Sequence, residues 1–376
     1  MLTCISGIIA CNTTKLPGTT SNSSNISSLR LLGEYDIPYN MTYNNTTVGG
    51  LSGIDYDHDR DCYYMISDDR STINPARFYT AHISFTKKGI DSIWFIETKS
   101  LLQANGNVYP NNKKDPYNTP DPEAMRYDPV KKQFVWSSEG ERIIRDRDTV
   151  LSDPAIRVID KGGKLIDSFL LPDNLHMNIA AKGPRQNSVF EGLDFADNYK
   201  SLFVSVEEPL YEDGPRADVT DNNAYVRILK FDAENKKNIT QYAYKLDPVA
   251  YQASPVTAYK INGIPDILYI GNNKLLVIER SFSTGRLACS IKVFMADLSG
   301  ATDIKDIASL KESKNFNPVT KRLLLNMDSL GIYIDNIEGL TFGPLLPNGH
   351  RTILFVADNN FSPIEKSQIL LFEVLE

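Results

Sequence analysis

The sequence predicts an all-β fold, a β-propeller of five four-stranded blades. Three observations support this prediction: a phrase that returns five times at intervals of 68 to 75 residues, short strand-like runs after each copy, and a strand missing from the last copy. A repeat of this length, built from several short strands, is typical of blades arranged around one axis. The five phrases are GGLSGIDYD at 49–57, DPEAMRYDP at 121–129, FEGLDFADN at 190–198, IPDILYIGN at 264–272 and NIEGLTFGP at 336–344.

Each of the first four repeats is expected to supply four strands, because its runs are rich in β-branched and aromatic residues and are separated by turn-forming residues. The runs of the first two repeats are 51–57, 62–69, 77–85 and 92–101, then 123–129, 133–140, 155–161 and 165–172. Those of the next two are 191–197, 201–208, 224–232 and 239–247, then 266–271, 274–282, 290–298 and 321–330.

The fifth repeat supplies only three strands, at 338–344, 352–360 and 368–375. We expect residues 29–38, which have strand character, to complete the last blade and so close the ring without an exposed edge. A six-bladed ring stays possible if 242–263 or 101–119 hides further strands.

Composition limits the classes of partner. The formal net charge is −7 and the isoelectric point is about 5.3, and no run of Lys and Arg is present, so nucleic acid is not an expected partner. No stretch of 18 apolar residues occurs that could span a membrane. We expect a monomer that acts on a small molecule.

The first 28 residues differ from the rest. A short apolar run leads to Ile9-Ala10-Cys11 and then to sequence rich in Asn, Thr, Ser and Gly. Small residues before a cysteine are similar to the lipobox of bacterial lipoproteins, in which that cysteine carries the lipid. We therefore expect residues 1–28 to be a truncated lipoprotein-type signal and flexible tether, with lipidation at Cys11, and residues 29–376 to be one exported propeller domain at the bacterial cell envelope, periplasmic or on the cell surface. A signal-peptide remnant without lipid is the alternative.

Two sets of acidic residues recur at equivalent positions of the repeats. In a propeller the first strand of each blade lines the central channel, so the first set should meet at its mouth. The first set is Glu123, Glu191, Asp266 and Glu338, with Ser52 in the remaining repeat. The second set, near the end of each second strand, is Asp68 and Asp69, Glu139, Glu207 and Glu208, Glu279, and Asp358.

Carboxylates that meet on one axis need counter-charge, which hard cations such as Ca²⁺ or neighbouring arginines can provide. We expect a divalent cation, Ca²⁺ being the first candidate, held by residues from Glu123, Glu139, Glu191, Glu207, Asp266, Glu279, Glu338 and Asp358. Arginines beside such a site can bind a phosphoryl group through charge-assisted hydrogen bonds. Arg70, Arg77 and Arg280 are the candidates for substrate binding, and Glu191, Glu123 and Glu338 are the candidates for catalysis.

Other interpretations stay open. One alternative is that the acidic residues serve only to hold neighbouring blades together. Another is that the channel mouth binds a ligand or protein partner at the cell surface without catalysis. A serine esterase that uses Ser52 is a third possibility, although the spacing identifies no base for it.

The same phrases resemble the family called esterase-like activity of phytase, or phytase-like domain. The residues that carry the resemblance are 50–54, 67–70, 76–79, 122–125, 137–140, 190–193, 279–282, 337–340 and 357–359. The resemblance extends from about residue 29 to the C-terminus and implies a β-propeller, usually exported in bacteria, that hydrolyses phosphate or carboxylic esters. The acidic signature of true β-propeller phytases is not found.

Overall fold

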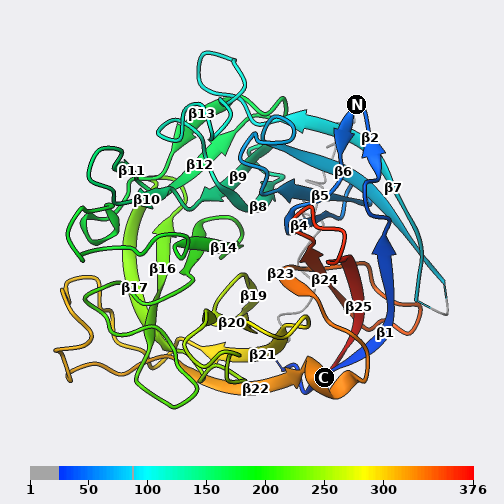
Figure 1. Ribbon diagram of the computed structural model, residues 1–376. Helices are drawn as coiled ribbons and strands as arrows, with labels where there is room; N and C mark the ends of the chain where they lie inside the picture. Colours follow the sequence, from blue (N-terminus) through cyan, green and yellow to red (C-terminus); the bar gives the residue numbers. More distant parts are fainter. Residues whose placement is uncertain (1–24, 87–88) are drawn as a thin grey trace, which may run out of the picture.

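The computed structural model describes residues 25–86 and 89–376. Five antiparallel sheets stand around a central axis and form a five-bladed β-propeller, which confirms the predicted fold and excludes a sixth blade within these residues (Figure 1). The only helices in the described ranges are two short 3₁₀ turns, η1 (Asp173–Leu175) and η2 (Met327–Leu330). No helix in this part of the chain has the length and apolarity of a membrane span. Cys11 lies outside the described residues.

The blades follow one another in sequence order. Blade 1 contains β4 (Leu51–Asp57), β5 (Cys62–Ser67), β6 (Arg77–Thr86) and β7 (Gly89–Ser100). Blade 2 contains β8 (Pro122–Asp128), β9 (Gln133–Ser138), β12 (Ala155–Ile159) and β13 (Leu165–Ser168). Blade 3 contains β14 (Phe190–Ala196), β15 (Ser201–Val206), β16 (Tyr225–Asp232) and β17 (Lys237–Lys245). In each of these blades the first strand is innermost.

Blade 4 departs from the expected pattern because its inner strand is broken. It contains β18 (Lys260–Gly263), β19 (Ile267–Gly271), β20 (Lys274–Ser283), β21 (Ser290–Asp297) and β22 (Thr320–Asn326). Both β18 and β19 pair with β20, so two short strands take the place of one. Two small hairpins were also not predicted: β2 (Thr42–Tyr43) with β3 (Thr46–Thr47), and β10 (Glu141–Ile143) with β11 (Val150–Ser152).

Blade 5 closes the ring with strands from both ends of the described chain. It contains β23 (Asn336–Phe342), β24 (Thr352–Asp358), β25 (Ser367–Leu375) and, outermost, β1 (Ser28–Ile37). The antiparallel pairing of β1 with β25 runs from Ser28 opposite Leu375 to Ile37 opposite Ser367. The prediction that a segment before the first repeat completes the last blade is confirmed.

Apolar residues of neighbouring blades pack against each other and form the core. In β9, Val135 packs into the core shared with blade 3, whereas Phe134 and Trp136 pack into the core shared with blade 1. This alternation is the two-residue period of a strand buried on both faces. Each sheet therefore supplies half of two different cores, and no blade is independent of its neighbours.

An arginine occupies the axis of the channel. Arg126, on β8, donates hydrogen bonds to the carbonyl oxygens of Ile54 and Leu340, both at 3.1 Å, and to Asp266 at 2.8 Å. Its Nε lies 3.4 Å from Asp194 of β14. The side chain of Arg126 therefore contacts the inner strands of the four other blades and fills the channel below its mouth.

Candidate functional site: the acidic mouth of the channel

Irregular strand pairing presents the predicted ring positions to the channel mouth. The inner strands of four blades shift register at the ring position, between Leu51 and Gly53, Pro122 and Met125, Phe190 and Leu193, and Ile337 and Gly339. A β-bulge leaves a residue unpaired and changes the direction of its side chain. Glycine follows Glu191 and Glu338 because neighbouring inner strands approach each other closely at these two positions. A Cβ on Gly192 would lie 2.5 Å from the Cα of Asp266.

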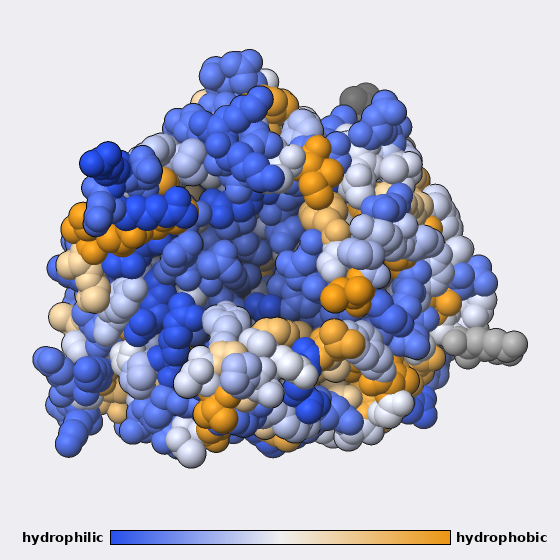
Figure 2. Space-filling view, viewed as in Figure 1, coloured by the Kyte–Doolittle hydropathy of each residue, from blue (hydrophilic) through white to orange (hydrophobic). Residues whose placement is uncertain are grey.

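A cavity of about 550 Å³ opens at this mouth. Figure 2 shows it as a strongly hydrophilic hollow at the centre of the ring. Nine carboxyl side chains and three arginines line it, so its formal charge is strongly negative. The carboxyl residues are Asp68, Asp121, Glu123, Glu191, Glu207, Asp335, Glu338, Asp358 and Glu365, and the arginines are Arg70, Arg280 and Arg286. Three predicted catalytic residues, Glu123, Glu191 and Glu338, are among them.

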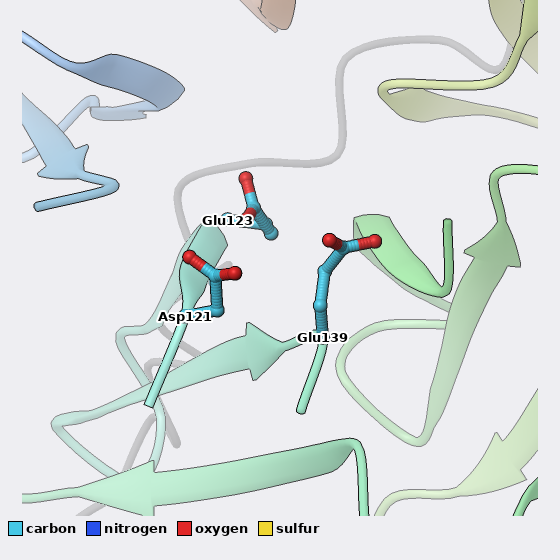
Figure 3. Close-up of side chains that lie close together, drawn as sticks. All are labelled: Asp121, Glu123 and Glu139. Carbon is cyan, nitrogen blue, oxygen red and sulfur yellow. The ribbon is translucent and has the colours of Figure 1, made fainter. Parts of the chain in front are cut away.

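Glu139 lies where two groups of carboxylates meet. Its oxygens approach those of Asp121 and Glu123 in one group and those of Glu191 and Glu207 in the other, with the potential ligand atoms of each group within 4.8 Å of one another. Figure 3 shows the carboxyl groups of Asp121, Glu123 and Glu139 directed toward a common space. The Oε1 atom of Glu139 accepts a hydrogen bond from the backbone N–H of Val189 at 2.5 Å, whereas its buried Oε2 atom receives no N–H or hydroxyl hydrogen bond. The carboxyl groups of Glu139 and Glu191 share a hydrogen bond only when one of them is protonated. An unpartnered buried carboxylate oxygen is costly unless something not yet present binds it.

The crowding of these acids raises their pKa values. Burial raises the pKa of Glu139 to about 8, with the charges of Asp121 and Glu207 adding to the effect. Burial also raises the pKa of Asp121 to about 7, against the opposing effect of Arg70. The pKa values of Glu123 and Glu191 are raised well above the usual range, first by burial and then by neighbouring carboxylates. The cluster therefore cannot carry its full negative charge at neutral pH without a bound cation.

Two arginines face the cavity with hydrogen-bonding capacity left over. Arg280 binds Glu207 at 2.8 Å and lies 3.2 Å from Glu338. Arg70 binds Glu141 at 2.9 Å and lies 3.3 Å from Asp121. The Nε atoms of both arginines are buried without a partner. Two of the three predicted substrate-binding residues, Arg70 and Arg280, thus line the cavity.

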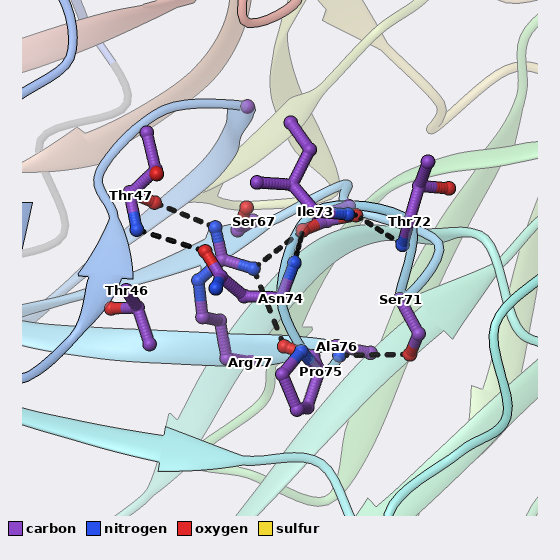
Figure 4. Close-up of polar contacts among 12 residues, drawn as sticks. Thr46, Thr47, Ser67, Ser71, Thr72, Ile73, Asn74, Pro75, Ala76 and Arg77 are labelled. Atoms are coloured by element: carbon purple, nitrogen blue, oxygen red, sulfur yellow. Dashed lines mark hydrogen bonds and ion pairs between the residues drawn. The ribbon is translucent and has the colours of Figure 1, made fainter.

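The prediction that Arg77 also binds substrate requires correction. Arg77 is buried outside the cavity, where it binds Asp69 at 2.8 Å and the carbonyl oxygen of Thr47 at 2.6 Å (Figure 4). Asp69 in turn accepts hydrogen bonds from the backbone N–H groups of Thr72, Ile73 and Asn74. Arg77 therefore fixes the loop between β5 and β6, which carries Asp68 and Arg70 into the cavity, and acts as a positioning residue.

Two predicted cation ligands also lie elsewhere. Asp266 is fully buried on the axis, where it accepts hydrogen bonds from Arg126 at 2.8 Å and from the backbone N–H of Leu340 at 3.0 Å. The break in the inner strand of blade 4 turns it away from the mouth, and the bulky Ile267 stands where the other repeats have Gly53, Ala124, Gly192 and Gly339. Glu279 is bound by Tyr244 of blade 3 at 2.8 Å and, within blade 4, by Asn262 at 2.7 Å and by Lys321. Neither lines the cavity.

Ser52 and the histidines do not form a hydrolase triad. The hydroxyl of Ser52 is buried and donates to the carbonyl oxygen of Glu123 at 2.6 Å, which links blades 1 and 2. None of the four histidines lines the cavity. The serine esterase interpretation has no geometric support here.

Sequence reasoning missed several residues of the cavity. Asp121 lies two positions before ring residue Glu123, and Asn336 lies two positions before Glu338. Asn336 donates to Glu338 at 2.8 Å and accepts from Arg280 at 2.5 Å. The start of each repeated phrase was a usable signal for these two, whereas Asp335 and Glu365 lie in connections with no recurring pattern.

Comparisons with solved structures find only weak similarity to this chain. A search of curated proteins found no match. Among solved structures, one titled as the Dos1 propeller has a TM-score of 0.34 at 8% identity, with 88% of this chain and 69% of that chain covered. Kuenenia stuttgartiensis hydrazine synthase gives 0.35 at 10% identity, with 89% and 99% covered. A GH43 β-1,3-galactosidase solved with galactodeoxynojirimycin gives 0.45 at 10% identity, with 89% and 92% covered. Similarities this weak say nothing about function.

The family comparison is more specific. The model of the family described as Phytase-like, esterase-like activity of phytase, matches residues 46–361, which include four of the blades in full and every residue that lines the acidic cavity except Ile364 and Glu365. The chain therefore belongs to the phytase-like family, esterase-like activity of phytase.

Proposed function

We propose that this protein is a cation-dependent hydrolase of phosphate or carboxylic esters that acts at the acidic mouth of the propeller. The observation that carries the proposal is the position of Glu139, which belongs to both clusters of carboxyl side chains and whose buried Oε2 atom receives no N–H or hydroxyl hydrogen bond. Family membership supports a hydrolase-like propeller but leaves the substrate open.

The residues present fit a hard divalent cation such as Ca²⁺. The donors of both groups are carboxylate oxygens only, the ligand type that Ca²⁺ and Mg²⁺ prefer. Burial raises their pKa values and repulsion between the carboxylates adds to the rise; a cation would relieve that repulsion. Glu139, Glu191 and Glu207 would hold it, with Asp121 on the other side of Glu139 as a further ligand. When bound, the cation neutralises charge and polarises the ester oxygen.

The remaining residues divide the work of hydrolysis. Arg70 and Arg280, which line the cavity, hold the phosphoryl or carboxyl oxygens. Glu338 is the candidate base, because Arg280 and Asn336 oppose the rise in its pKa and favour its ionised form. It accepts a proton from the attacking water. Glu123, whose pKa is raised well above its usual range, stays protonated and donates to the leaving oxygen.

The test combines metal analysis with an activity screen. Purified protein should contain or bind Ca²⁺, and excess chelator should abolish turnover of at least one ester in a panel of phosphate and carboxylic esters. Glu191→Gln should have the same effect as chelation, whereas Glu234→Gln, at an exposed site far from the cavity, should leave turnover unchanged. Turnover that persists in excess chelator would remove the cation from the mechanism.

The screen also decides against the non-catalytic alternative. A binding propeller would show ligand-dependent thermal stabilisation with no turnover of any ester. Turnover lost in Glu191→Gln would exclude it.

We further propose that the protein is exported and anchored through Cys11, on the basis of the small residues that precede this cysteine. Labelled fatty acid should be incorporated into the full chain and not into Cys11→Ala. Equal labelling of both would refute the anchor.

A further inference from the structure

The acidic cavity has two chemically different sides. Every lining residue from blades 1 to 3 is charged or polar, namely Asp68, Arg70, Asp121, Glu123, Asn187, Glu191 and Glu207. The lining from blades 4 and 5 is mixed: all the apolar lining residues come from it, beside eight charged or polar residues, Arg280, Arg286, Asp335, Asn336, Glu338, Asp358, Asn360 and Glu365. The apolar residues include Tyr259, Ile261, Phe282, Leu287 and Ile364. Figure 2 shows this apolar surface at the lower right of the hollow.

The outer part of the apolar side is exposed. Leu287 is 71% exposed, Ile364 is 69% exposed and Tyr259 is 53% exposed. Side chains this exposed add little to the core, and apolar groups gathered beside a charged cavity are typical of a surface that a ligand covers.

Hydrogen bonds hold the backbone of the apolar side, called the apolar wall from here on, in place. Thr284 donates from its backbone N–H and from its hydroxyl to the carbonyl oxygen of Tyr259, at 3.0 and 2.9 Å. The hydroxyl of Tyr333 donates to the carbonyl oxygen of Leu287 at 3.3 Å. The ring of Tyr259 also packs near that of Phe282, with centroids 6.2 Å apart. Because these contacts exist before any ligand binds, covering the wall requires little reordering.

We propose that the substrate is an amphipathic ester, whose phosphoryl or carboxyl group lies at the charged side and whose apolar group lies against Tyr259, Leu287 and Ile364. The proposal deepens the proposed function and rests on it. A polyol ester, which is polar on all sides, would leave the apolar wall exposed to water and gain nothing from it. The wall therefore selects aryl and alkyl esters over esters of sugars and polyols.

Binding of non-hydrolysable analogues tests the inference without depending on turnover. Calorimetry on the Ca²⁺-loaded protein should show 2-phenylethylphosphonate binding about tenfold more tightly than 2-hydroxyethylphosphonate. Leu287→Ser and Ile364→Ser should each reduce this preference by about fivefold. Both sites are exposed, so neither variant should impair folding. Leu170→Ser, at a site 59% exposed and outside the cavity, is the control and should keep the preference.

The outcomes separate this inference from the proposed function. Equal affinity for the two phosphonates, binding of neither, or a preference unchanged in both variants would overturn the inference. Turnover of 2-phenylethyl phosphate and 2-hydroxyethyl phosphate, two primary alkyl esters of similar intrinsic reactivity, is measured in parallel. If the protein prefers the phenylethyl phosphonate but hydrolyses neither ester, the proposed hydrolase function is refuted and the proposal of an amphipathic ligand stands. If both esters are hydrolysed equally, the proposed hydrolase function stands and the proposed role of the apolar residues in substrate selection is refuted.

Discussion

Replacing Arg126 with methionine should destabilise the propeller, and more strongly at high pH than at low pH. The guanidinium of Arg126 is the ionic partner of Asp266, which is fully buried. Methionine fills much of the same volume but leaves that carboxyl group without a cation. The folded variant must then either bury an unpaired charge or keep Asp266 protonated.

The magnitude follows from the cost of keeping the proton. The unperturbed pKa of this carboxyl group is 3.8. Holding a proton against that value costs about 6 kcal/mol at pH 8 and about 2 kcal/mol at pH 5. Because the folded variant binds more protons than the unfolded chain above pH 4, its stability falls as pH rises. In the wild type, burial already raises the pKa of Asp266, so the expected difference between the two pH values is up to about 4 kcal/mol.

The assay is urea unfolding of the wild type and Arg126→Met at pH 5 and pH 8, followed by circular dichroism. Lost hydrogen bonds to the carbonyl oxygens of Ile54 and Leu340 should add about 1 kcal/mol each at both pH values. Arg145→Met, at an exposed loop site, is the control for loss of one positive charge. A loss of stability that is equal at the two pH values, or larger at pH 5, would refute the assignment of Arg126 as the counter-ion of the axial carboxylates.

Three further predictions concern the cavity and the ring. Glu139→Gln should weaken Ca²⁺ binding, measured by calorimetry, by at least tenfold, because it removes the oxygen shared by two carboxylate groups; unchanged affinity would contradict the proposed ligand set. Ca²⁺ affinity of the wild type should rise between pH 6 and pH 9, because the pKa values of Asp121 and Glu139 are raised to about 7 and about 8 and a cation must displace those protons; a flat profile would show that these acids are not ligands. Arg77→Met should lower the apparent affinity for ester substrate and destabilise the fold by about 3 kcal/mol, because it leaves Asp69 buried and unpaired and releases the loop that carries Arg70; unchanged affinity in kinetic assays would contradict the positioning role.

The architecture was predictable from the sequence because it rests on periodic signals. A propeller is built from short strands whose side chains alternate between two faces, as in Gln133–Ser138. Each blade also begins on a similar inner strand, which is why the Glu-Gly pair returns before an apolar strand. The ring positions Glu123, Glu191 and Glu338 were found for the same reason.

The exceptions arise where local backbone differs between repeats. Asp266 occupies the ring position by its spacing in the sequence, but the interruption between β18 and β19 directs its side chain to Arg126. No periodic pattern in the sequence predicts this interruption. Arg77 is separated from the cavity by a loop whose path depends on three backbone hydrogen bonds to Asp69. Spacing in sequence places a residue on a strand, whereas such loop contacts decide which way its side chain points.

The pairing of β1 with β25 has a consequence for biosynthesis. During synthesis β1 is translated before the other strands of the five blades, and its partner strand β25 is translated after them. Joining segments this distant carries a large loop-closure entropy and makes the step slow. Until then blade 5 lacks its outer strand, and with it the stable placement of Glu338 and Asp358. The acidic cavity is therefore completed only after β25 has been translated, and chains that terminate before β25 should lack it.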